Sequence, residues 1–118
     1  MASKKPGKQR KRIYRAKLHK RKRLVSARLS KSLAKEMAKR SLGLRKGDEV
    51  RVMRGDHKKI TGKVTKVDLK ESKVYVDSLK RKKVSGEEVV IPIHASNLMI
   101  IKADMADKKR QRAIRRAK

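Results

Sequence analysis

Alternating apolar and polar positions run through residues 46–103, the pattern of strands that have one buried face. Five short segments carry it, with apolar positions at Val50 and Val52, Val64 and Val67, Val74 and Val76, Val89, Ile91 and Ile93, and Leu98 and Ile100. Turn residues separate these segments at 54–56, 68–72 and 85–86. Short β-branched strands at this spacing predict a mainly β fold, a small antiparallel barrel over residues 44–103. Val64 and Val67 are three residues apart, which predicts a bulge or bend there.

Two segments outside the strands carry helical signals. Apolar residues recur every four positions behind a capping serine, at Leu29, Leu33 and Met37 after Ser30. This spacing predicts a short helix within residues 30–42 that packs on the barrel, with Gly43 at its exit. Residues 104–118 predict a basic C-terminal helix capped by Asp104 or Asp107.

The two ends of the chain are strongly basic. Residues 1–45 hold 18 Lys and Arg against one acidic residue, and residues 104–118 hold seven against two. Pro6-Gly7 interrupts any early structure, and the like charges of Lys20 to Arg23 oppose folding. We therefore expect residues 1–29 to form an extended arm that becomes ordered on RNA. A solvated tail and a nuclear-import signal at residues 20–23 remain alternatives.

The formal net charge of +28 indicates a polyanionic partner. Nucleic acid fits better than a membrane, because no segment joins a bulky apolar face to a basic one and no apolar run is long enough to span a bilayer. There is no cysteine and no apolar leader, so we expect a soluble intracellular protein. Tyr14 and Tyr75 are the only aromatic residues, which favours recognition of phosphates and shape over base stacking.

The sequence offers no catalytic or metal-binding pattern. His19, His57 and His94 lie in separate segments without metal-ligand spacing, and Glu87 and Glu88 face opposite sides of a strand. We expect no enzyme activity, cofactor, metal, small-molecule substrate or homo-oligomer. Arg54-Gly55-Asp56 spells a cell-adhesion tripeptide, but in this context it predicts a tight turn in which the glycine permits positive φ.

Lys46 to Asp56, followed by Gly62-Lys63-Val64, resembles the KOW motif, in which two strands and a glycine-containing loop open an SH3-like barrel. The arm resembles that of the archaeal large-subunit ribosomal protein family numbered twenty-four, and the match covers nearly the whole chain. The segments that carry this second resemblance are Lys8-Gln9-Arg10-Lys11, Tyr14, Ala16, Leu18-His19-Lys20-Arg21, Leu29-Ser30, Val89 to His94, Ser96-Asn97 and the basic end from Asp107.

The resemblance implies a structural constituent of the large ribosomal subunit, located in the cytoplasm. It implies binding to the 5′ domain of large-subunit ribosomal RNA early in assembly, contact with other ribosomal proteins, and a place near the polypeptide exit. For His94, packing of a turn is an equal alternative to contact with RNA. The RNA-binding residues implied by the resemblance, together with three basic residues of the third turn (81–83), are Arg10, Lys11, His19, Lys20, Arg21, Arg54, Lys58, Lys63, Arg81, Lys82, Lys83, His94 and Ser96.

Three positions depart from the family pattern. Lys59 stands in place of a usual glycine, and Ala95 and Lys17 stand in place of usual prolines. None of the three changes removes positive charge, so we expect altered loop shape without loss of RNA binding. A KOW transcription factor that contacts polymerase and a small DNA-compacting protein are the competing functions, and an enzyme is the most distant one.

Overall fold

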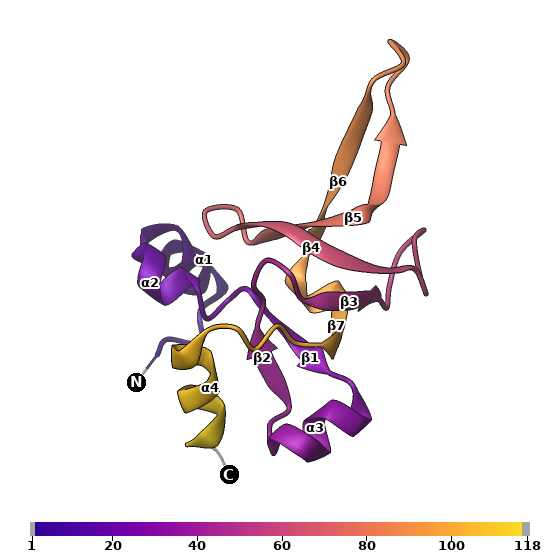
Figure 1. Ribbon diagram of the computed structural model, residues 1–118. Coiled ribbons are helices and arrows are strands. Elements are labelled where there is room, and N and C mark those ends of the chain that lie inside the picture. The colour runs from indigo at the N-terminus through magenta and orange to yellow at the C-terminus, as the bar shows by residue number, and fades with distance from the viewer. Residues whose placement is uncertain (1, 117–118) are drawn as a thin grey trace.

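A seven-stranded sheet forms the body of the protein in the computed structural model, which describes residues 2–116 (Figure 1). Its hydrogen-bonded order is β2-β1-β7-β3-β4-β5-β6. The strands are β1 (Ser26–Leu29), β2 (Ser41–Gly43), β3 (Glu49–Val52), β4 (Thr61–Asp68), β5 (Lys73–Lys82), β6 (Glu88–His94) and β7 (Leu98–Lys102). The helices are α1 (Pro6–Arg15), α2 (Leu18–Arg21), α3 (Lys31–Met37), the 3₁₀ turn η1 (Ala95–Asn97) and α4 (Lys108–Arg115).

All five predicted strands are present, as β3 to β7. Alternating apolar side chains of β3, β4, β5 and β7 form the core, and Val50, Val74, Leu98 and Ile100 have no measurable exposure to solvent, whereas Val89 in β6 is 40% exposed. The predicted irregularity in β4 is also confirmed, because the register against β5 shifts between Val64 and Lys66. The mainly β fold is therefore confirmed.

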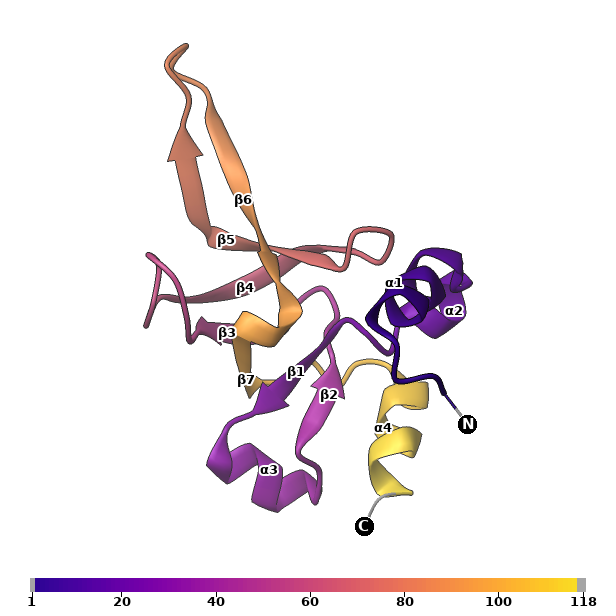
Figure 2. The ribbon, with the colours of Figure 1, turned by 180° about the vertical axis from the view of Figure 1, so that it is seen from behind.

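The sheet is open, so the closed antiparallel barrel is not confirmed. β3 to β6 run as an antiparallel meander, and η1 brings β7 back beside β3. Beyond β7 the sheet continues into β1 and β2 instead of closing on β6, and β1 pairs with β7 in parallel. β5 and β6 project from the body as a long hairpin (Figures 1 and 2).

The prediction of an extended arm over residues 1–29 is wrong for most of its length. Residues 6–15 and 18–21 are helical, and residues 26–29 form β1 in the sheet. Pro6 starts α1 instead of breaking structure, because proline at the first helical position loses no hydrogen bond and already has a helical φ. Val25, Ala27 and Leu29 alternate and are buried, a strand signal hidden by the surrounding charge.

The predicted helix at residues 30–42 is shorter than expected. Ser30 caps it, since its hydroxyl accepts a hydrogen bond from the Leu33 backbone N–H at 3.4 Å. The helix ends at Met37, and Ala38 takes the left-handed conformation expected of a C-cap, with φ 52°. Gly43 belongs to β2, so its assignment to the helix exit is wrong.

Gly62 is the glycine whose lack of a side chain is required for close packing. A Cβ at this position would lie 2.6 Å from Asp77 Oδ1 and 2.7 Å from Val76 Cγ1 on β5. We expect Gly62→Ala to lower the free energy of unfolding by about 1–3 kcal/mol, the usual cost of overpacking. Gly43→Ala is the matched control, because nothing lies within 4 Å of its Cβ position. Equal urea midpoints for the two variants would contradict this prediction.

Candidate nucleic-acid interface

The first group of basic side chains lies on α1 and α2. Neither helix buries a residue, and Arg10, Lys11, His19 and Lys20 are all exposed. No acidic residue occurs within residues 6–21, so both helices carry only positive charge, beside the exposed apolar side chains of Ile13, Tyr14 and Leu18. The arm therefore keeps the predicted charge, but presents it on a folded, helical support.

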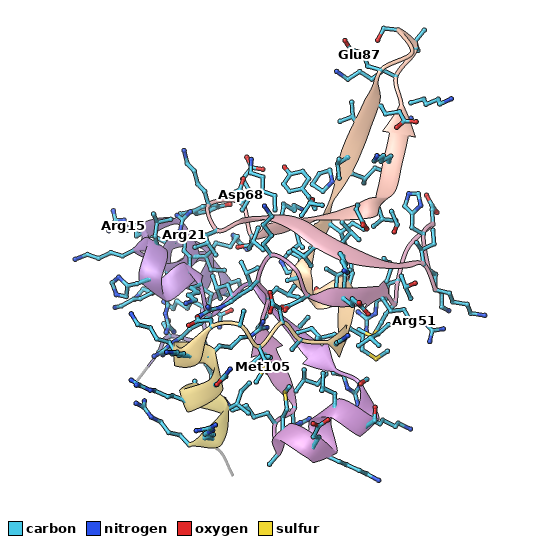
Figure 3. The ribbon with its side chains drawn as sticks, viewed as in Figure 1. Arg15, Arg21, Arg51, Asp68, Glu87 and Met105 are labelled. Carbon is cyan, nitrogen blue, oxygen red and sulfur yellow. The ribbon has the colours of Figure 1, made fainter. Side chains whose placement is uncertain are left out.

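Arg21 is the exception in this group, because its guanidinium donates hydrogen bonds to backbone carbonyls of the protein. Nε donates to the Ala16 carbonyl at 3.0 Å, one terminal nitrogen to Tyr14 O at 2.5 Å, and the other to Lys70 O at 2.8 Å. Lys70 lies in the turn between β4 and β5. Figure 3 shows Arg21 near Asp68, the last residue of β4 before this turn. Arg21 thus connects the two N-terminal helices to the sheet, a structural role that the sequence did not indicate.

The second group lies in the loop between β3 and β4. Arg54 and Lys58 are exposed, and Lys63 follows on β4 with its side chain also exposed. Gly55 has φ 96°, which confirms the predicted tight turn. The Lys63 backbone N–H donates to Asp77 Oδ1 at 2.9 Å, and this hydrogen bond holds the pKa of the Asp77 carboxyl below its usual value. The loop base is therefore fixed to β5 while its cations stay in solvent.

Lys59, one of the departures from the family pattern, adopts φ 73°. A non-glycine residue pays a steric cost in this left-handed region, partly offset by the greater freedom of glycine in the unfolded chain. We expect Lys59→Gly to raise the free energy of unfolding by about 0.5–1 kcal/mol. Lys58→Gly, at an ordinary φ, serves as the control and should destabilise. Thermal or urea unfolding checks both, and a destabilised Lys59→Gly variant would contradict the assigned backbone strain.

The third group lies at the end of the β5–β6 hairpin. Arg81, Lys82 and Lys83 are exposed there, and Figure 3 shows Glu87 at the tip. Lys83 Nζ lies 3.8 Å from a Glu87 carboxylate oxygen, and both side chains are more than half exposed. A surface pair of this kind holds its partners weakly. The lysine therefore remains available to a phosphate.

His94 and Ser96 interact with each other. His94 Nδ1 accepts from the Ser96 backbone N–H at 3.2 Å and lies 2.8 Å from Ser96 Oγ. The histidine thus caps η1, the turn that returns β7 to β3. This geometry supports the turn-packing alternative for His94, and both side chains remain exposed.

Asp48 and Arg110 form a buried ion pair that sequence reasoning missed. Two Arg110 nitrogens donate to the two Asp48 carboxylate oxygens at 2.6 and 2.7 Å, and the side chains are 3% and 0% exposed. The same nitrogens also donate to Gly43 O and Asp104 O, at 3.0 and 2.8 Å. Arg110 Nε is buried without a partner among residues 2–116. A single arginine thus docks α4 against the sheet.

Other contacts support this docking. Asp107 caps α4 through the Lys109 backbone N–H at 2.8 Å, as predicted, and its second oxygen pairs with Arg45. Ile114 is buried, whereas Ala106 and Ala113 are exposed. The helix begins at Lys108, so the predicted start at Asp104 is four residues too early; residues 117 and 118 lie outside the described residues.

The predicted RNA-binding residues do not converge on one patch. In Figure 1, α1 and α2, the β3–β4 loop and the hairpin tip lie at three separate extremities of the molecule. Within residues 2–116, no group of three potential metal ligands is present. The helices of that range also include none long and apolar enough to cross a membrane. The exposed basic side chains therefore lie in separate groups that are held apart by the sheet.

A small open sheet that carries exposed cations at several extremities is typical of a structural, nucleic-acid-binding class of protein. Comparison with known families makes this specific. Residues 3–117 match the family of ribosomal proteins L26 (eukaryotic) and L24P (archaeal), and the chain belongs to that family. It is a ribosomal protein and not an enzyme, as its sequence led us to expect.

A curated relative supports this assignment. The chain is 47% identical over 113 residues to a protein of Pyrobaculum islandicum named large ribosomal subunit protein uL24. The alignment covers 96% of this chain and 92% of the relative. The similarity therefore includes both basic ends as well as the sheet.

Proposed function

We propose that this protein is a structural constituent of the large ribosomal subunit that binds the 5′ domain of large-subunit ribosomal RNA. It acts early in subunit assembly, in the cytoplasm, and lies near the polypeptide exit beside other large-subunit proteins. It works as a single copy. Support comes from the family membership, the printed name of the relative, and the net charge of +28.

One observation carries the proposal: the fold uses a few cations for its own contacts and leaves many others exposed. Arg21 and Arg110 donate hydrogen bonds to other residues of the protein. Arg10, Lys58 and Lys82, in contrast, are exposed at three extremities. Each exposed cation can replace counterions at a phosphate, and the sheet fixes its direction. Such a protein stabilises a folded RNA by joining phosphates from several helices.

We also propose that β3 to β7 correspond to the SH3-like unit of the KOW motif. The meander of β3 to β6 and the return of β7 beside β3 through η1 support this correspondence. Gly47 and Gly62 of the motif-like segment have structural roles that fit it. Gly47 has φ 94°, and Gly62 allows close approach of β5.

Crosslinking in living cells, followed by sequencing of the attached nucleic acid, tests the proposed function. We expect crosslinks at a few sites near the 5′ end of large-subunit ribosomal RNA. Mapping the crosslinked peptides assigns each site to the N-terminal helices, the β3–β4 loop or the hairpin. Crosslinks spread over nascent transcripts or genomic DNA would overturn the proposal and favour a transcription or DNA-compacting role.

A further inference from the structure

An open cavity of about 400 Å³ lies beside the end of α2, next to the first group of predicted RNA-binding residues, and its lining includes no residue of the β3–β4 loop or of the hairpin tip. Three chain segments meet there: Lys22 directly after α2, residues 44–46 between β2 and β3, and residues 65–69 of β4 and its turn. The cavity therefore exists only in the folded chain.

The lining combines an apolar part with a positive part. Leu44, Val67 and Leu69 are buried or half-buried and supply the apolar part. Lys22, Lys46 and Lys66 are exposed lysines that supply the positive part. None of the lining residues is acidic, so the cavity is complementary to a ligand that joins an apolar body to negative charge.

Arg45 and Thr65 are the remaining lining residues, and Arg45 is held in place. Its guanidinium pairs with Asp107 at the start of α4, so the docked C-terminal segment fixes one wall of the cavity. Arg21 binds the Lys70 carbonyl and so ties the segment before Lys22 to the turn that includes Leu69. A guanidinium with a fixed plane is a surface on which a nucleobase can stack.

We propose that this cavity binds one unpaired, extruded nucleotide of ribosomal RNA. The base would contact the apolar lining and the Arg45 plane, while its flanking phosphates would contact the three lysines. An RNA duplex presents phosphates on a convex surface and cannot place a base in such a cavity, whereas loops and bulges can. This inference rests on the proposed function, and adds a base-contacting site to a surface otherwise suited to phosphates.

A variant that fills the cavity without changing charge tests the site. The full-length wild type and Leu69→Trp are compared for their Kd for transcribed large-subunit ribosomal RNA and for nucleotide-resolution chemical probing of that RNA. We expect Leu69→Trp to weaken binding about tenfold, the range of one lost base contact. We also expect it to restore the reactivity of the one or two unpaired nucleotides that the wild type protects. Ile101→Trp adds the same side chain at an exposed position outside the lining and should behave as wild type.

Two outcomes separate this site from the proposed function. Unchanged affinity and probing pattern for a folded Leu69→Trp variant would overturn the nucleotide site alone. Failure of the wild type to prefer ribosomal RNA over duplex DNA would overturn the proposed function as well. If Leu69→Trp does not fold, photocrosslinking of the wild type to 4-thiouridine-substituted RNA tests whether RNA occupies the site. Crosslinked peptides within residues 44–46 or 65–69 support the site, and crosslinks confined to other segments overturn it.

Discussion

Replacing Arg110 with methionine lowers the free energy of unfolding by about 3–5 kcal/mol, because it leaves the buried Asp48 carboxylate without its counter-charge. Arg110 also loses its hydrogen bonds to two backbone carbonyls. Asp48 keeps the Arg45 and Asp104 backbone N–H donors, at 3.0 and 2.9 Å, which compensate the charge only in part. Urea unfolding followed by circular dichroism measures the change.

Two further variants make this result specific to the buried pair. Lys83→Met breaks an exposed pair with Glu87 and should cost less than about 1 kcal/mol. Asp48→Leu combined with Arg110→Met should recover part of the loss, since apolar replacement of both partners removes the uncompensated charge. A loss below 1 kcal/mol for Arg110→Met alone would show that α4 is not docked in solution.

Deletion of residues 1–23 weakens binding to ribosomal RNA by about a thousandfold at 150 mM salt, if half of the removed cations contact phosphates. This segment holds 12 of the 39 Lys and Arg residues. The full chain should lose about three to five decades of affinity between 50 and 200 mM salt, and the truncated chain should show a shallower slope. Filter binding over a salt series measures both quantities.

The truncated chain should nevertheless keep a cooperative unfolding transition. α1 and α2 bury no residue, and the buried side chains begin at Val25. The control for loss of charge elsewhere is a variant in which Lys31 and Lys35 on α3 are changed to glutamine. In this variant the slope of the logarithm of the binding constant against the logarithm of the salt concentration should decrease in magnitude by at most about two. Loss of the cooperative transition on truncation would mean that the contact between Arg21 and the β4–β5 turn stabilises the fold.

The buried ion pair also changes how the basic C-terminus is understood. The sequence predicted a basic helix over residues 104–118 but did not indicate what holds it against the sheet. In the structure, Arg110 and Ile114 attach α4 to the sheet, so the remaining cations are presented in a fixed direction. A preorganised basic helix loses less conformational entropy on binding than a disordered one.

The sequence by itself determined the features that depend on neighbours a few residues apart. Alternation at Val50–Val52 and Val74–Val76 identified strands, and the three-residue spacing of Val64 and Val67 identified the bulge. Ser30 was predicted as a helix cap, and Asp107 was one of two predicted candidates, because a cap bonds a backbone N–H two or three residues away. The excess of Lys and Arg indicated the chemical class of the partner.

Only the tertiary structure decided which charged residues serve the fold. Asp48 and Arg110 are 62 residues apart, and nothing local marks either as buried. Arg21 reaches a carbonyl 49 residues away, so its role could not be distinguished from that of neighbouring cations. The strand β1 needed β2 and β7 as partners before its alternation outweighed its charged surroundings. Local sequence patterns determine the helices and strands. Long-range contacts determine which charged side chains are buried and bonded within the protein, because these contacts form only when the chain folds.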